Sequence, residues 1–143
     1  RGIVHLLGGD DPTQPSLLNT LLFYGSESID GLPAWLAAWG MLCFQSIFNF
    51  FVTSGSGQAA LTMPLMAPLS DLIGVTRQVA VLAFQLGDGL TNMVVPTSAS
   101  LMGCLGAARL DWLQWLRTAR WFFLGLALLA SLFVVLATVF GYH

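Results

Sequence analysis

One carboxylate, Asp88, lies in a long apolar run and has a glycine on each side. It is the only charged residue from Gln78 to Ala108. An ionisable side chain inside a membrane segment is costly and usually functional. Carboxylate, carbonyl and hydroxyl oxygens are the ligands that hard cations prefer, so Asp88 could bind Na+. Protonated, it could carry H+ instead. The alternative is that Asp88 only caps the second half of an interrupted helix.

The glycines beside this carboxylate predict that the helix opens there and frees backbone carbonyls. Thr91 and Asn92 follow one turn later and are expected to face the same break, which continues through Pro96 and Thr97. Two half-helices joined by unwound backbone are typical of the discontinuous helices of carriers. We therefore predict a broken transmembrane helix over residues 77–108.

A second polar interruption, Thr53–Gln58, lies between two apolar flanks, and no charge occurs from Gly31 to Ser70. Irregular backbone at membrane depth is tolerated only where it is buried in protein or lines a cavity. The arm that follows, Gln58–Leu72, reaches only about 22 Å as a helix, which is short for a span. The pattern predicts a re-entrant helical hairpin over residues 33–73, with its tip near the middle of a bilayer.

The tip offers small hydroxyl side chains and unhindered backbone. These candidate residues are Ser54, Gly55, Ser56 and Gly57. Half-helices starting near Gln58 and Thr97 would direct their positive ends at an anionic group, which suits a carboxylate-bearing solute. The alternative for the tip is a flexible turn. Asn49, at the end of the first arm, either binds solute or satisfies tip carbonyls.

The composition indicates an all-α integral membrane protein. The chain has 143 residues, is 56% hydrophobic and only 8% charged, and has a mean hydropathy of +0.77. Soluble domains carry roughly 25% charged residues and could not cover their surface with so few. The surroundings of such a chain would be membrane lipid. The net charge of −2 argues against a nucleic-acid partner.

Three further segments complete the predicted organisation. Residues 1–32 are expected to form a loop and an interfacial amphipathic helix. Residues 109–120 hold three arginines and two tryptophans, which predicts a cytoplasmic link. Residues 121–143 are predicted to form a plain membrane-spanning helix. The C-terminus and the open end of the hairpin would then lie on the side of the membrane opposite the cytoplasmic link.

Enzyme chemistry is not indicated. Gly55–Ala60 matches G-x-G-x-x-A, but a dinucleotide site needs a βαβ unit and an acidic residue about 20 positions later. Ser56 lacks the glycine two positions earlier that a nucleophile elbow requires. Cys43 and Cys104 lack the neighbours of a metal site. We expect no cofactor other than a coupling ion.

The segments NFFVTSGSGQAALTMPLMAPLSD and RQVAVLAFQLGDGLTNMVVPTS resemble the C-terminal half of YfcC-type carriers, which belong with the C4-dicarboxylate carriers of the ion transporter superfamily. The resemblance implies inverted repeats, each with a re-entrant hairpin and a broken helix, and a homodimer formed by a scaffold domain. It places Ser54, Gly55 and Ser56 at the hairpin tip. It places Asp88, Thr91, Asn92 and Pro96 at the broken helix, lining solute and Na+ sites. The tip reads Ser-Gly-Ser-Gly here, which weakens the expectation of a dicarboxylate.

Together these features predict the C-terminal part of a secondary carrier of the cell inner membrane. Its solute would be a C4-dicarboxylate, a basic amino acid or a short-chain acid. Transport would be coupled to Na+ or H+, or run as exchange. The chain opens without an initiator Met and in mid-element, so we expect the N-terminal half of the same carrier to be missing. The competing classes are a passive channel and a structural subunit of a membrane complex.

Overall fold

The computed structural model describes residues 32–142, so the predicted interfacial helix within residues 1–32 lies almost entirely outside the described residues. Helices alone make up the regular structure of this part. They are α3 (Ala34–Phe51), α4 (Gly55–Leu72), α5 (Arg77–Asn92), α6 (Ala99–Ala107) and α7 (Trp112–Val139). The all-helical prediction is confirmed over residues 32–142, while the re-entrant placement of the hairpin in a membrane stays a prediction.

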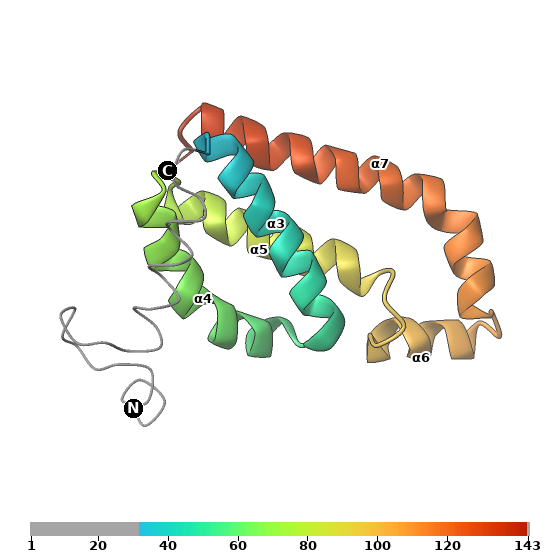
Figure 1. The fold of residues 1–143 in the computed structure, drawn as a ribbon. Helices are drawn as coiled ribbons and strands as arrows, with labels where there is room; N and C mark the ends of the chain where they lie inside the picture. Colours follow the sequence, from blue (N-terminus) through green and yellow to red (C-terminus); the bar gives the residue numbers. More distant parts are fainter. Residues whose placement is uncertain (1–31, 143) are drawn as a thin grey trace, which may run out of the picture.

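Helix α5 lies at the centre of the arrangement (Figure 1). Helix α3 crosses it and also contacts α7, while α4 packs against α3 and α5. Small residues such as Ala38 and Ala83 are fully buried where these helices meet, beside Val79 and Val134. Small side chains let apolar helices approach closely, which is how helices associate in lipid.

Two of the described helices are long and apolar enough to cross a membrane. These are α3, with a mean hydropathy of 1.3, and α7, with 2.6. Only 11% of the α7 window is buried inside the protein, against 33% for α3. Helix α7 therefore presents most of its apolar surface outward.

The hairpin tip is shorter than predicted. Only Val52–Ser54 separate α3 from α4, whereas Gly55, Ser56 and Gly57 form the first turn of α4. The reason is a cap: the Ser54 side chain accepts a hydrogen bond from the Gly57 amide at 3.4 Å. Helix α4 then continues through Pro64 and Pro68.

The broken helix is interrupted later than predicted. Helix α5 runs unbroken through Asp88 to Asn92, so the prediction that the helix opens at the glycines is wrong. The interruption comprises Met93–Ser98. Pro96 explains its position, because proline disfavours the helical conformation of the preceding residue and lacks an amide hydrogen.

Helix α7 begins earlier than predicted, at Trp112, so residues 112–120 are helical and the link is only Ala108–Asp111. Asp111 starts the helix by accepting a hydrogen bond from the Leu113 amide at 3.2 Å. At the other end, the Thr76 hydroxyl donates to the Tyr142 carbonyl at 2.6 Å. The C-terminal turn therefore lies beside the α4–α5 connection, at the end remote from the α6–α7 turn (Figure 1).

Candidate functional site

The hairpin tip and α5 meet at Asp88. The Asn49 side-chain amide donates to the Asp88 carbonyl at 3.1 Å, and the Asn92 amide donates to the Asp88 carboxylate at 2.9 Å. A Cβ placed on Gly55 would lie 3.0 Å from Asp88 Oδ2. The carboxylate therefore lies against the first residue of α4, where the helix dipole favours negative charge.

This position bears on the alternative that Asp88 caps the second half of the broken helix. That half, α6, begins after Ser98, and its N-cap residue makes no side-chain cap hydrogen bond. Asp88 is instead associated with the start of α4. The capping alternative is wrong as stated, because the helix does not open at Asp88.

The hairpin tip also meets the interruption of the broken helix. The Thr97 hydroxyl donates to the Phe50 carbonyl at 3.1 Å, and the Thr53 hydroxyl donates to the Thr97 carbonyl at 3.5 Å. Side-chain hydrogen bonds thus satisfy backbone groups that the two interruptions leave open. The two polar interruptions recognised in the sequence lie together in the fold.

Two amide oxygens beside Asp88 lack a hydrogen-bond partner among the described residues. They are Asn49 Oδ1 and Asn92 Oδ1, and Asn49 is 0% exposed. A third unpaired amide oxygen among the described residues, Gln58 Oε1, lies between the hairpin arms. Leaving a buried acceptor unpaired costs about 1–3 kcal/mol, so such a pair calls for an explanation. Together with the Asp88 carboxylate, these oxygens have the chemistry that a hard cation requires. No three His, Cys, Asp or Glu side chains gather within residues 32–142.

Behind the tip, a buried polar network joins the two hairpin arms. Gln58 Nε2 donates to Gln45 Oε1 at 2.8 Å and to the Gln45 carbonyl at 3.0 Å. Gln45 Nε2 donates in turn to the Thr62 hydroxyl at 3.1 Å. Both glutamines are 0% exposed. Sequence reasoning missed this network, although uncharged amides in apolar helices were a usable signal.

Gly87 explains how α5 reaches this network. A Cβ on Gly87 would lie 3.0 Å from Gln45 Cβ and 3.2 Å from the Ser46 backbone nitrogen. A Cβ on Gly89 would meet nothing within 4 Å. Gly87 therefore permits close packing of α5 against α3, one residue before Asp88, rather than opening the helix.

Two tryptophans of α7 hold the broken-helix backbone. Trp112 Nε1 donates to the Val94 carbonyl at 2.9 Å, and Trp115 Nε1 donates to the Met93 carbonyl at 3.1 Å. The sequence indicated only interfacial positions for these indoles. Each of these two carbonyls therefore already accepts one hydrogen bond from an indole, and only its second lone pair is left for another partner.

The remaining predicted site residues have varied positions. Ser56 Oγ lies 3.4 Å from Ser54 Oγ, and a Cβ on Gly57 would lie 3.3 Å from Ser54 Oγ, so all three gather at the cap of α4. Pro96 is exposed within the interruption. Thr91 lines a separate cavity between α3, α5 and α7.

Arg77 lies at the opposite end of α5 and is already paired. Its Nε donates to both carboxylate oxygens of Asp71 at 3.0 Å. This hydrogen bond lowers the pKa of Asp71, a surface group, and the carboxylate raises the pKa of Arg77. All five basic residues are arginines, and none occurs between Arg77 and Arg109. Asp88 is therefore an acidic group beside the tip, and residues 78–108 contribute no basic side chain to offset it.

Comparison with known proteins identifies the family. Residues 1–140 match the DcuC family, described as C4-dicarboxylate anaerobic carrier, and the chain belongs to this family. Its members are carriers rather than enzymes, and the membership supports a membrane protein with a role in transport.

Two relatives are informative. The chain is 52% identical over 143 residues to the Escherichia coli protein named "Putative basic amino acid antiporter YfcC"; the alignment covers 100% of this chain and 28% of that protein. It is 34% identical over 89 residues to an uncharacterized Haemophilus influenzae protein, covering 62% of this chain and 18% of that one. The chain thus spans less than a third of the length of these relatives. No solved structure matches it.

Proposed function

We propose that the carrier containing this chain is a multi-pass protein of the cell inner membrane that moves a small carboxylate-bearing solute by alternating access. The hairpin α3–α4 would enter the membrane from one side and return to it, with Val52–Ser54 near the bilayer centre. Family membership supports carriage, and the meeting of the tip with the interrupted helix supports a site at that depth.

The observation that carries the proposal is the group of oxygens around Asp88. Its carboxylate lies beside two amide side chains whose oxygens are unpaired among the described residues. A Na+ ion bound by the carboxylate would offer a partner to the unpaired amide oxygens beside it. Uptake of H+ by Asp88, or exchange of one solute for another, are the other forms of coupling.

The charges at the tip favour an amino acid over a dicarboxylate. The N-terminus of α4, with Ser54, Gly55 and Ser56, offers amide hydrogens to a carboxylate. When no Na+ is bound, Asp88 offers its charge to an ammonium group of the solute. A dicarboxylate would place its second negative charge near Asp88 without a basic side chain from residues 78–108 to offset it. The printed name of the Escherichia coli relative, a basic amino acid antiporter, accords with this choice.

Other parts of the carrier would complete the site. We propose that the N-terminal half supplies a matching first repeat, and that two carriers associate as a homodimer. The broken helix and hairpin would then move together, because Gly87 packs α5 closely against α3 and the Gln45–Gln58 bonds join α3 to α4.

The test is Asp88→Asn in the full-length carrier, reconstituted in proteoliposomes. Asparagine can still accept the hydrogen bond from Asn92, so the fold should persist while dependence on Na+, pH or counter-solute is lost. We expect ion-dependent uptake to fall at least tenfold. Asp111→Asn is the matched control, because asparagine also caps helices and the Asp111 carboxylate accepts its hydrogen bond from the Leu113 amide, not from a tip residue.

Counterflow separates a carrier from the competing classes. Only a carrier exchanges labelled for unlabelled solute across the membrane, whereas a channel conducts without saturation. Unchanged uptake and unchanged ion dependence in the Asp88→Asn variant would remove the coupling role. Saturable counterflow that persists in that variant would support the carrier function and contradict only the proposed cation site.

A further inference from the structure

The first half of α4, which leads to the hairpin tip, is held in the fold by polar groups. Its buried residues, Gln58 and Thr62, are both polar. The apolar contacts of α4 with the core, Met66 and the partly buried Leu69, lie in its second half. Pro64 separates the two halves and cannot donate a helix hydrogen bond, because proline lacks an amide hydrogen. The position of the tip therefore depends on what Gln58 and Thr62 bind.

Gln58 makes four hydrogen bonds, and these join the tip to α3. Its backbone amide donates to the Ser54 carbonyl at 2.7 Å, and its carbonyl accepts from the Thr62 hydroxyl at 3.0 Å. Its side-chain amide donates twice to Gln45, which in turn donates to Thr62. The side chains of Gln45, Gln58 and Thr62 thus form a closed polar ring. Because hydrogen bonds are directional, this ring fixes where α4 lies along α3.

The polar ring also lies against α5 beside the candidate site. Gln45 Cβ is the nearest atom to a methyl group placed on Gly87, at 3.0 Å, and Asp88 is the next residue. At the tip, a Cβ on Gly55 would lie 3.0 Å from Asp88 Oδ2. Gln45 therefore touches both helices that meet at the site, α5 by packing and α4 by hydrogen bonds. Any slide of α4 along α3 would change the separation between Gly55 and the Asp88 carboxylate.

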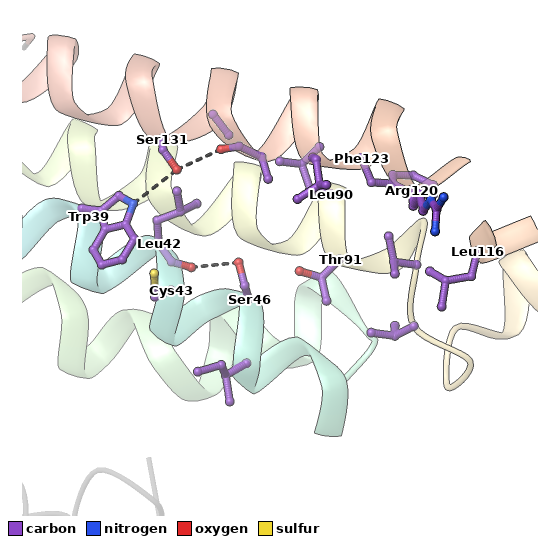
Figure 2. A pocket seen from close by; sticks show the side chains of 16 residues that line it. Trp39, Leu42, Cys43, Ser46, Leu90, Thr91, Leu116, Arg120, Phe123 and Ser131 are labelled. Atoms are coloured by element: carbon purple, nitrogen blue, oxygen red, sulfur yellow. Dashed lines mark hydrogen bonds between the residues drawn. The ribbon is translucent and has the colours of Figure 1, made fainter. Parts of the chain in front are cut away.

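The residue after Gln45 contributes nothing to this junction. Ser46 lines the cavity of about 620 Å³ between α3, α5 and α7 (Figure 2). Its hydroxyl donates to the Leu42 carbonyl of its own helix at 2.9 Å. Within residues 32–142, the bonds from Gln45 to Gln58 and Thr62 are the only side-chain hydrogen bonds between α3 and α4.

The polar ring contains an acceptor that stability alone does not explain. Gln58 Oε1 is buried and accepts no hydrogen bond from the described part of the chain. Apolar side chains of similar size in place of both glutamines would remove this unpaired acceptor, and such paired replacements can be nearly neutral or stabilising. A fixed position of α4 is what the two carboxamides provide and apolar side chains would not.

We propose that Gln58 and Gln45 are positioning residues, which set the separation between the first amides of α4 and the Asp88 carboxylate and thereby the affinity of the tip for solute. This rests on the proposed function, in which the amides bind a solute carboxylate and Asp88 binds its ammonium group. A solute that touches both ends is bound best at one separation. Both glutamines act without touching the solute, since each is 0% exposed.

The experiment compares Gln58→Met with the double variant Gln45→Met/Gln58→Met in the full-length carrier. Methionine is unbranched like glutamine but has no amide. The single variant leaves Gln45 Oε1 buried without its donor, so its unfolding temperature should fall. The double variant removes both partners and should unfold at the wild-type temperature or above it. Ser46→Ala is the matched control on α3, because the Ser46 hydroxyl bonds only its own helix.

The position of α4 is measured by electron paramagnetic resonance in a cysteine-free background. Spin labels replace the exposed side chains of Leu61 on α4 and Val81 on α5. We expect a broader distribution of distances between them in the double variant. Labels at Ile47 and Val81 form the control pair, whose distances should not change because Gly87 still packs α5 against α3.

Affinity is measured as the half-saturating concentration of arginine in exchange of labelled arginine by proteoliposomes. In the double variant it should rise about tenfold, the factor that corresponds to roughly one lost hydrogen bond, while the maximal rate stays close to that of the wild type. A structural role alone would return the affinity to normal together with the unfolding temperature.

Unchanged distances between the labels on α4 and α5 in the double variant would overturn the proposal, whatever happens to transport. Broader distances with an unchanged half-saturating concentration would overturn it as well. A wild-type carrier that exchanges no arginine would overturn the affinity part together with the proposed solute class. The distance measurement needs no solute, so failure of the positioning role and failure of the proposed function are told apart.

Discussion

The hairpin with α5 and the long helix α7 are both apolar in sequence, yet the hairpin buries polar as well as apolar side chains, whereas α7 buries apolar side chains alone. The hairpin arms enclose polar groups, and Gln45, Asn49 and Gln58 are each 0% exposed. Helix α7 buries only Ala119, Ala130 and Val134. Its large side chains point outward, with Leu128 72% exposed.

This difference in buried side chains indicates two roles, holding the site around Asp88 and contacting lipid. In the hairpin unit, buried amides and hydroxyls bind one another and the backbone, so the helices are held in one arrangement around Asp88. In α7 the exposed apolar surface fits lipid contact. The two parts meet through the packing of Ala130 and Val134 against α3 and α5, and through the indoles of Trp112 and Trp115, which bond the interrupted backbone.

The largest expected effect on stability is at Gly87. Gly87→Ala would place a methyl group 3.0 Å from Gln45 Cβ and 3.2 Å from a backbone nitrogen, so α5 must move away from α3. Overpacking of this kind typically costs about 1–3 kcal/mol. We expect a clearly lower thermal unfolding temperature of the full-length carrier in detergent.

Gly89→Ala is the matched control on the same helix. Nothing lies within 4 Å of the added methyl group, and alanine favours helix over glycine by up to about 1 kcal/mol. This variant should be unchanged or more stable. Equal losses from both substitutions would contradict the close packing of α3 against α5.

A smaller effect is expected where α7 meets the break. Trp112→Phe and Trp115→Phe each remove one indole donor and leave a backbone carbonyl without it. Each should destabilise the carrier by about 1 kcal/mol. Trp121→Phe serves as the control, because Trp121 is 72% exposed and no hydrogen bond of its indole is seen within residues 32–142. Equal unfolding temperatures of all three variants would show that the indoles do not hold the break.

The smallest effect is expected at the surface pair Asp71–Arg77. The folded pKa of Asp71 is lowered by its hydrogen bond to Arg77, so the pair stabilises the fold above the ordinary aspartate pKa. That contribution is lost as the pH falls through the lowered value, below about 4. Asp71→Asn should lower the unfolding temperature slightly at neutral pH, and the difference should vanish at acid pH and at high salt. A difference that grows toward acid pH would contradict this sign.

Much of the architecture follows from sequence alone, because polar groups in apolar runs are rare enough to stand out. Polar interruptions around Gly55 and Asp88 were recognised in the sequence, and the structure brings Asp88 against Gly55. The precise break was not predicted, because glycines such as Gly87 can remain helical where packing favours it, and Pro96 sets the interruption instead.

Other features depend on contacts between distant residues, which no local pattern reveals. Ser54 draws the glycine-rich tip into α4 through a cap, which shortened the predicted loop. The bonds from Trp112 and Trp115 join segments whose sequences give no sign of pairing. Membership in the carrier family was predicted from two sequence motifs and is confirmed by the match of residues 1–140 to the DcuC family.

The central claim is that the hairpin tip and Asp88 form one ion-coupled site at membrane depth. The most direct measurement is the rate at which a small thiol reagent modifies Ser56→Cys in the full-length carrier, with Cys43 and Cys104 replaced by serine. We predict slow modification that Na+ or solute slows further at constant pH, and loss of this protection when Asp88→Asn is added. Fast modification from bulk water, or equal protection with and without the Asp88 carboxylate, would contradict the account.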